Sequence, residues 1–356
     1  MLTLFSLFII NSAMAFPEML RHHYINCSAC HVSNSGGGVL NAYGRSISSE
    51  LLSTWGTQKE ARPFYTMESD KIGQWLNMGG DVRSVQVHQE TNQFKKGRSI
   101  WMEANIQAAI SIQKLTSFVS VGQVQQPNQS WKAETTKYYF SFQQSDELAL
   151  RVGHYIPTYG LNIPQHTFLI KQNLFFGPGS ERNSADLQWN GEKWNFLLGI
   201  SKSSLNSSVR DEEQAYNFQI QRTIADQYKI GFSQWYGDAT NYRKLISGVH
   251  TVLGWTEKFY TLAELDHMWT KDNSNVETKS IAQLLKFGYE MEKGLHLQFV
   301  EEWGTSSTSD INNLGLGFIW YPRPHFELEG LYSKRQITTT TDSTEDYAYL
   351  VTHFYF

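Results

Sequence analysis

Two cysteines and a histidine stand together near the start of the chain. Cys27 and Cys30 are its only cysteines, two residues separate them, and His31 follows directly. In such a C-x-x-C-H run, the two thiols can bond to two vinyl groups at one edge of a haem macrocycle, and the histidine gives the iron a nitrogen ligand. The spacing therefore predicts one covalent haem c, with Cys27 and Cys30 as thioether ligands and His31 as the proximal iron ligand.

Three other chemistries share part of this pattern. Two cysteines of an exported protein form a structural disulfide by default. A thiol redox pair has the same spacing but usually follows a strand in a βαβ unit, and no such unit surrounds Cys27. A zinc site would need two further ligands, which His22 and His23 could supply. The histidine directly after Cys30 favours haem.

The sequence does not single out one ligand for the other face of the iron. His22 and His23 are the nearest imidazoles, and we expect one of them to be the distal ligand. Met19, Met67 and Met78 are thioether candidates, which would raise the potential relative to two histidines. A five-coordinate iron is the remaining alternative.

The residues after the motif could cover a flat ligand. Gly36–Gly38 would let the backbone approach it without side chains in the way. Residues 39–55 have the apolar spacing of an amphipathic helix, which either covers the haem or packs elsewhere. Its apolar positions are Leu40, Tyr43, Ile47, Leu51 and Leu52.

The first 15 residues resemble an export signal. An apolar run from Leu2 to Ile10 precedes Ala13-Met14-Ala15, which fits a small-x-small cleavage site before Phe16, although no Lys or Arg precedes the run. We therefore divide the chain into a signal peptide (1–15), a haem c-binding segment (16–78) and a third region (79–356).

From Gly79 onward, apolar and polar residues alternate in segments of strand length. Ile106, Ala108 and Ile110, for example, alternate with Gln107 and Ala109. A period of two indicates strands with one apolar face. We expect an all-β fold: a transmembrane antiparallel β-barrel of about 16 strands, preceded by a short, partly helical haem c segment.

The connections support a barrel over a soluble β-sandwich. Tight turns are expected at 145–146, 190–191, 257–258, 293–294 and 322–324, and longer loops near 203–212, 271–278, 304–310 and 337–345. Short turns at one end and long loops at the other are typical of outer-membrane barrels. An even strand count would put both barrel ends on the periplasmic side, where the haem segment also begins.

One connection is unusually apolar. Residues 159–182, between the expected fifth and sixth strands, contain Phe168, Ile170, Leu174 and Phe175. Such a loop is expected to fold into the lumen and constrict it. The alternative is an exterior loop packed on itself.

The C-x-x-C-H segment and a barrel whose last, aromatic strand ends in Phe356 together resemble the fused outer-membrane cytochrome–porin family. The stretch from Cys27 to Arg45 is also similar to cytochrome-bearing segments of proteobacterial membrane proteins. The resemblance implies electron transfer, and the best known members pass electrons inward from extracellular ferrous iron.

The leading functional hypothesis is electron transfer across the outer membrane, rather than classical enzyme catalysis. One haem cannot span a bilayer about 30 Å thick, so a periplasmic electron carrier and an extracellular donor or acceptor are expected partners, besides membrane lipid. The alternatives are a transport channel with a structural or sensory haem and a haem enzyme with an open iron site. The net charge of −4 argues against nucleic-acid binding. Glu103, Arg151 and Lys229 are expected only to solvate the lumen.

Overall fold

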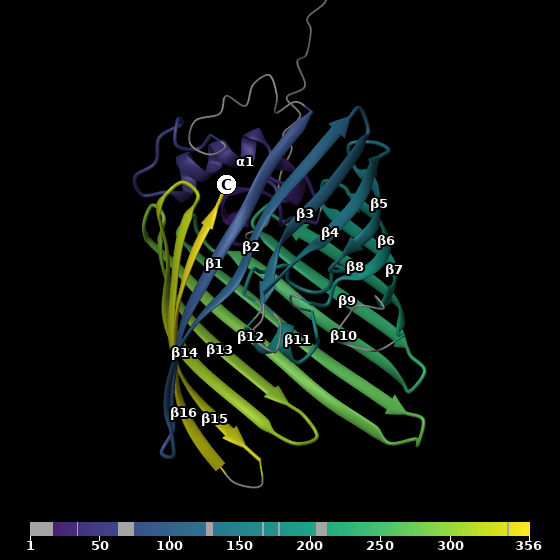
Figure 1. Cartoon of the computed structure of the whole chain (residues 1–356), viewed down its shortest axis with the longest axis vertical. Helices are drawn as coiled ribbons and strands as arrows, with labels where there is room; N and C mark the ends of the chain where they lie inside the picture. The colour runs from purple at the N-terminus through teal and green to yellow at the C-terminus, as the bar shows by residue number, and fades with distance from the viewer. Residues whose placement is uncertain are drawn as a thin grey trace, which may run out of the picture.

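The computed structural model describes residues 17–33, 35–62, 75–125, 131–165, 167–176, 179–203, 212–339 and 342–356. These residues form sixteen strands, each hydrogen-bonded antiparallel to the next, and β1 closes the barrel against β16 (Figure 1). The predicted fold and strand number are therefore confirmed. The strands are β1 (Leu76–Glu90), β2 (Lys95–Ile112), β3 (Leu115–Gln125), β4 (Trp131–Gln143), β5 (Leu148–Tyr155), β6 (Arg182–Asn190), β7 (Trp194–Ser203), β8 (Gln214–Ile224), β9 (Tyr228–Asp238), β10 (Tyr242–Gly254), β11 (Phe259–Asp272), β12 (Glu277–Glu292), β13 (Leu295–Thr305), β14 (Asp310–Arg323), β15 (Phe326–Thr338) and β16 (Asp342–Tyr355).

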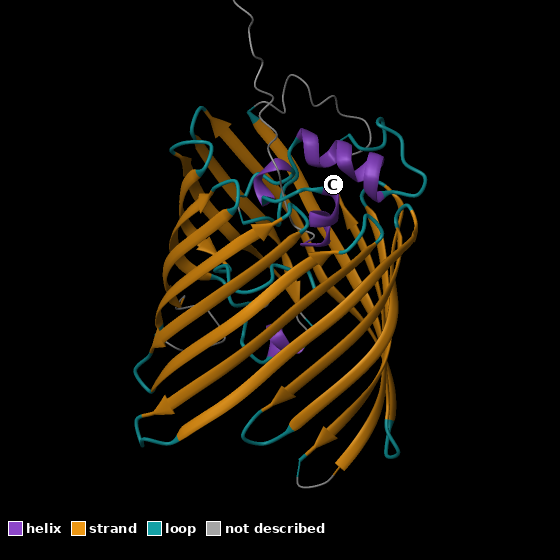
Figure 2. Cartoon of the chain, turned by 180° about the vertical axis from the view of Figure 1, so that it is seen from behind, coloured by secondary structure: helices purple, strands orange, loops and turns teal. Residues whose placement is uncertain are grey.

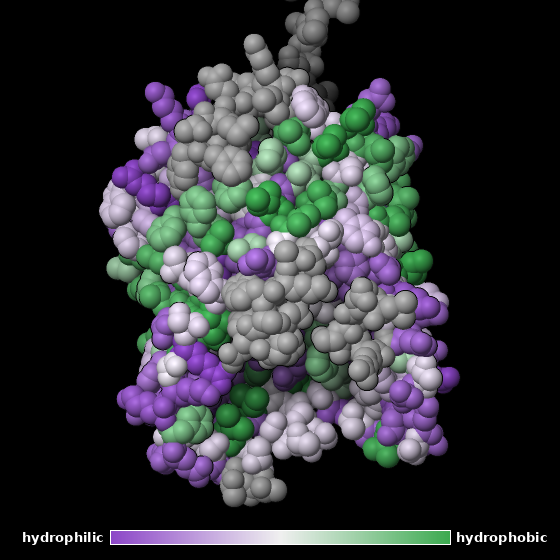
Figure 3. All heavy atoms as spheres, viewed as in Figure 1, coloured by the Kyte–Doolittle hydropathy of each residue, from purple (hydrophilic) through white to green (hydrophobic). Residues whose placement is uncertain are grey.

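The alternating pattern places apolar side chains outside and polar ones inside. On β2, Ile106 is 61% exposed, whereas its neighbour Gln107 is 3% exposed. Leu316 on β14 is likewise 66% exposed and Asn313 is 1% exposed. Figure 3 shows such apolar side chains on the outer wall, with hydrophilic ones gathered toward the lower end. An apolar exterior around a polar lumen is the arrangement of a membrane barrel.

The connections differ between the two ends. All five predicted tight turns are confirmed, for example 191–193 between β6 and β7. Three of the predicted long loops are wrong, because β11–β16 extend further and leave only 273–276, 306–309 and 339–341 as connections. Beyond the apolar belt both faces of a strand are wet, so the polar strand ends lack the alternation that identified the rest. The fourth predicted loop, 203–212, lies mostly outside the described residues.

The segment before the barrel is partly helical and lies at the same end as the C-terminus (Figures 1 and 2). Its elements are η1 (Pro17–His22), η2 (Cys27–Ala29), α1 (Ala42–Ile47) and η3 (Ser48–Leu52). We call residues 17–33 and 35–62 the plug. The expected helix at 39–55 is confirmed in shorter form: Asn41 caps α1 by accepting a hydrogen bond from the Gly44 amide (2.9 Å).

Only one of the two predicted boundaries can be compared with the structure. The expected signal peptide, 1–15, lies outside the described residues, and β1 begins at Leu76, three residues before the expected start. No helix in the described part of the chain is long and apolar enough to cross a membrane.

The connection between β5 and β6 folds into the lumen, as predicted. It carries the short helix α3 (Leu169–Gln172), visible inside the barrel in Figure 2. Leu161, Phe168 and Ile170 pack with wall residues such as Leu262 and Leu284 in one buried cluster. We call residues 156–165, 167–176 and 179–181 the lumen loop.

Candidate functional site

The C-x-x-C-H residues form one helical turn. Element η2 covers Cys27–Ala29, and the His31 amide donates to the Cys27 carbonyl (3.1 Å). Because side chains three positions apart are neighbours on a helical surface, the turn brings the Cys27 and Cys30 side chains to the same side. Both thiols are partly buried, and no disulfide joins them. Burial, reinforced by Cys27, raises the pKa of the Cys30 thiol to about 12.

Asn41 fixes this turn against the following helix. Its side-chain amide donates to the Ala29 carbonyl (2.7 Å), and its backbone amide donates to the Cys30 carbonyl (2.8 Å). Gly44 packs so closely here that a Cβ would lie 2.3 Å from the Cys30 oxygen. Helix α1 therefore holds the motif in place.

His31 is buried beside a cavity and is 7% exposed. Burial lowers its pKa to about 4, so the imidazole is neutral at pH 7 and has a lone pair for a metal. Among the described residues, no group hydrogen-bonds to its buried Nδ1. A buried, neutral imidazole with an unused nitrogen fits the role of an iron ligand.

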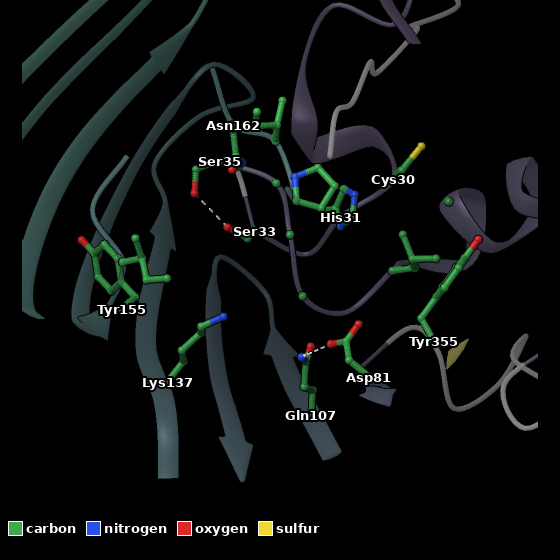
Figure 4. Close-up of a pocket in the computed structure, with 18 of the residues that line it drawn as sticks. Cys30, His31, Ser33, Ser35, Asp81, Gln107, Lys137, Tyr155, Asn162 and Tyr355 are labelled. Atoms are coloured by element: carbon green, nitrogen blue, oxygen red, sulfur yellow. Dashed lines mark hydrogen bonds between the residues drawn. The ribbon is translucent and has the colours of Figure 1, made fainter. Parts of the chain in front are cut away.

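The cavity has a volume of about 340 Å³ and lies between the plug, the wall strands and the lumen loop (Figure 4). Cys30, His31 and Gly36–Gly38 line it from the plug side. Its size is within the range of about 300–1,000 Å³ that cofactor pockets occupy. Cys27 lines an adjoining cavity of about 90 Å³. Ser35, Thr158 and Asn162 border both spaces, so a ligand held by both thiols would cross this border.

The glycine run at the cavity uses backbone conformations that other residues rarely adopt. Gly36, Gly37 and Gly38 have φ angles of +79°, +72° and +68°. A Cβ on Gly37 would meet nothing within 4 Å, whereas one on Gly38 would lie 3.3 Å from Gln107 Oε1. The predicted approach of bare backbone to a ligand is therefore sterically available.

The structure does not bring His22 or His23 to this cavity. The His22 Nε2 accepts a hydrogen bond from Arg21 Nε (3.1 Å), and burial lowers the pKa of His22 to about 4. His23 is exposed, with φ +65°. Met19, in contrast, is buried and lines the cavity. Met67 lies outside the described residues.

Two of the three alternative chemistries of the motif, the zinc site and the disulfide, are not assembled in the described part of the chain. Among the described residues, no group of three or more His, Cys, Asp or Glu side chains is arranged to hold a metal ion, so His22 and His23 do not complete a zinc site with the cysteines. The two thiols are also not joined in a disulfide.

Charged residues on two wall strands, β5 and β9, bind the plug. Arg151 donates to the Ser35 hydroxyl (2.7 Å) while it pairs with Asp186 (2.6 Å). Lys229 donates to the Ile25 carbonyl (2.6 Å). The expectation that Arg151 and Lys229 only solvate the lumen is therefore wrong. Alternation shows that these side chains face inward, but it carries no signal for the segment that fills the lumen.

Other contacts fix the plug at both ends. Arg21 forms a buried ion pair with Glu290 on β12 (2.7 Å). At the rim, the Thr54 amide donates to the Tyr321 carbonyl (2.9 Å), and the Trp55 ring packs edge-on against Trp320 at 5.6 Å between centroids. The plug thus belongs to the folded barrel.

Comparisons with known proteins identify the fold. No protein family and no curated protein matches the chain. Among solved structures, the outer membrane channel DcaP of Acinetobacter baumannii is similar with a TM-score of 0.61 at 11% identity, over 79% of this chain and 97% of that one. The anion-selective porin from Comamonas acidovorans gives 0.62 at 8% identity, over 79% and 99%. OprB of Pseudomonas putida gives 0.62 at 8% identity, over 86% and 99%. This chain has the fold of outer-membrane porins.

Proposed function

We propose that this protein is an outer-membrane barrel that carries one covalent haem c in its periplasmic mouth and transfers electrons between the periplasm and the exterior. The observation that carries the proposal is the C-x-x-C-H turn, whose buried His31 and partly buried Cys30 line a cavity inside the mouth of a porin-like barrel. Membrane lipid, a periplasmic electron carrier and an extracellular donor or acceptor, such as Fe(II), would be its partners.

The architecture supports the proposed location. The barrel has an apolar exterior and the fold of outer-membrane porins. Short turns of such barrels face the periplasm, and the plug and the C-terminus lie at the end with the short turns (Figure 1). The motif would then face the compartment in which haem c is attached to exported chains.

The residues of the mouth have distinct roles in this proposal. Haem c bound through Cys27 and Cys30 would supply a one-electron couple with His31 on the iron. His31 is neutral at pH 7, Asn41 fixes the turn, and the lumen loop closes the cavity from the far side. A distal ligand from His22 or His23 would require the turn at 22–24 to move, whereas Met19 already lines the cavity.

The filled mouth disfavours a diffusion channel. Leu20 and Val39 of the plug are almost fully buried, and Arg21 and Lys229 fasten the plug to the wall. Solute transport and catalysis at an open iron site are therefore the alternatives, and the second experiment distinguishes them from electron transfer.

The first test asks whether the haem exists. The protein is produced in a host that attaches haem c, purified from outer membranes, and its haem measured as the pyridine haemochrome. We expect one haem per chain, and none in Cys27→Ala/Cys30→Ala, with heat-modifiable mobility retained because the barrel strands are untouched. Ser28→Ala is the matched control inside the motif. Wild-type protein without covalent haem would refute the proposal.

The second test asks what the haem does. In proteoliposomes loaded with a reduced c-type carrier, external ferric chelate should be reduced by the wild type and not by the double cysteine variant. A six-coordinate, low-spin spectrum is expected. Carbon monoxide binding with no transmembrane reduction would favour the enzyme alternative, and solute conductance with no electron transfer would favour the channel.

A further inference from the structure

The cavity beside His31 contains a lysine without a partner. Arg83, Lys137, Arg151 and Lys171 line it. Arg151 pairs with Asp186 (2.6 Å), and Lys171 donates to the Tyr159 carbonyl (3.3 Å). In the described part of the chain, no hydrogen bond or ion pair involves Lys137.

Two carboxylates of the same cavity, those of Asp81 and Glu327, are already engaged. Asp81 accepts from Gln107 (2.7 Å) and His353 (3.0 Å), and Glu327 accepts from the other nitrogen of His353 (2.9 Å). Asp81 lies within electrostatic range of Lys137, but the two form no ion pair. A half-buried ammonium group is stabilised by an anion close to it, and the cavity has room for one.

Arg83 is the second cation with capacity to spare. Its Nη1 lies 4.0 Å from Glu103 Oε1, at the limit of an ion pair, and its Nη2 is 3.5 Å from the His353 ring. A guanidinium has five N–H donors, so Arg83 keeps donors for a ligand. Arg83 and Lys137 together would match two negative charges.

Arg83 and Lys137, on the wall strands, and the Cys30 thiol, on the plug, lie on different sides of the cavity. Lys137 is on β4, where its neighbour Tyr138 faces outward and is 46% exposed. Figure 4 shows the Lys137 ammonium pointing into the space that His31 borders from the plug, with Gln107 and Asp81 beside it. A ligand attached to the plug would therefore present its far edge to Lys137.

Haem has the required shape and charge. Its two vinyl groups, which cysteines bind, lie on the edge of the macrocycle opposite the two propionate carboxylates. We propose that Lys137, assisted by Arg83, binds these carboxylates, an inference that rests on the proposed function. The plug would hold one edge of the haem covalently, and the barrel wall would hold the other edge electrostatically, so the haem itself would join the plug to the wall.

The test compares Lys137→Met, Lys137→Arg and Lys96→Met in the full chain. Lys96 lies exposed on β2 and is the control for loss of one positive charge. All three variants should carry one covalent haem. Lys137→Met should lower the midpoint potential, because loss of a cation beside the haem favours the ferric form, and should shift the infrared band of ¹³C-labelled propionates. Lys137→Arg should largely restore both properties, and Lys96→Met should change neither.

The outcomes separate this inference from the proposed function. Covalent haem in the wild type, with the same potential and propionate band in Lys137→Met, would overturn the inference and leave the haem assignment intact. Wild-type protein without covalent haem would overturn both. If Lys137→Met does not fold, the wild type decides: a propionate band equal to that of a water-exposed haem peptide would overturn the inference, and a shifted band would support it.

Discussion

The lumen holds two segments that are fastened by different chemistry. The plug is held through side chains and carbonyls: Arg151 reaches Ser35, and Lys229 reaches the Ile25 oxygen. The lumen loop is held through backbone amides, which donate to wall carboxylates, and through the Tyr159 and Gln165 side chains, which donate to Asp266 (2.9 Å) and Glu329 (3.2 Å). The Leu161 amide donates to Glu264 (2.8 Å), and the Leu169 amide donates to Glu302 (2.6 Å).

This difference shows which contacts depend on the side chains of the inserted segment and which depend only on its backbone. A backbone amide is present in almost any residue, so the lumen loop can change in sequence while Glu264 and Glu302 still bind it. The plug contacts depend on particular side chains, among them Ser33, Ser35 and Arg21. The Arg21 and Ser35 contacts of the plug therefore tolerate fewer substitutions than the Leu161 and Leu169 amide contacts of the lumen loop do.

The largest expected effect follows from the loss of Arg151. In Arg151→Met, the buried Asp186 carboxylate loses its cation, and Ser33 and Ser35 lose their donor. Breaking a buried pair in this way costs about 3–5 kcal/mol. We expect a correspondingly lower free energy of unfolding in urea and faster proteolysis of the plug, with the lumen loop still protected.

Arg243→Met is the matched control, because Arg243 pairs with Asp238 where both side chains are more than half exposed. Its loss should cost about 1 kcal/mol or less. Equal destabilisation in the two variants would show that the Arg151 contact does not fasten the plug.

A smaller effect is expected at Glu302. Glu302→Ala removes the acceptor of the Leu169 amide and of the Asn313 side chain (2.6 Å). A buried donor without a partner costs about 1–3 kcal/mol. Hydrogen exchange of the Leu169 amide should accelerate by about tenfold or more, while the plug keeps its protection.

Glu302→Gln separates loss of the acceptor from loss of the charge, because its amide oxygen can still accept. We expect exchange close to that of the wild type in this variant. If Glu302→Gln loosens the lumen loop as much as Glu302→Ala does, the charge of the carboxylate holds the loop. The hydrogen bond from the Leu169 amide would then not be what fastens it.

The barrel could be predicted from the sequence because its signal is local. Polarity alternates from one residue to the next along each strand. Of two neighbours such as Ile106 and Gln107, one side chain points outward and the other points inward. The strand number and the tight turns followed from that alternation and from turn residues, and the lumen loop followed from its apolar composition. The ends of β11–β16 did not, because both their faces meet water.

The interior of the mouth could not be predicted in the same way. Arg151 and Ser33 are 118 positions apart, and Arg21 and Glu290 are 269 apart. Contacts between residues so far apart leave no local pattern in the sequence. From the sequence alone, inward-facing charges are therefore interpreted as residues that line an open lumen. The C-x-x-C-H turn is the exception, since the three residues proposed to hold haem lie within five positions and haem attachment would require that spacing.

The smallest expected effect concerns the contact between the two segments. The Asn162 side chain of the lumen loop donates to the Ser35 carbonyl, and Arg151 donates to the Ser35 hydroxyl. Because Asn162 is exposed, Asn162→Ala should cost only about 0.5–1.5 kcal/mol. The variants Arg151→Met, Asn162→Ala and their combination form a double-mutant cycle on urea unfolding. We expect a coupling energy of at least about 0.5 kcal/mol, since both side chains bind Ser35. Strict additivity would mean that plug and lumen loop are fastened independently.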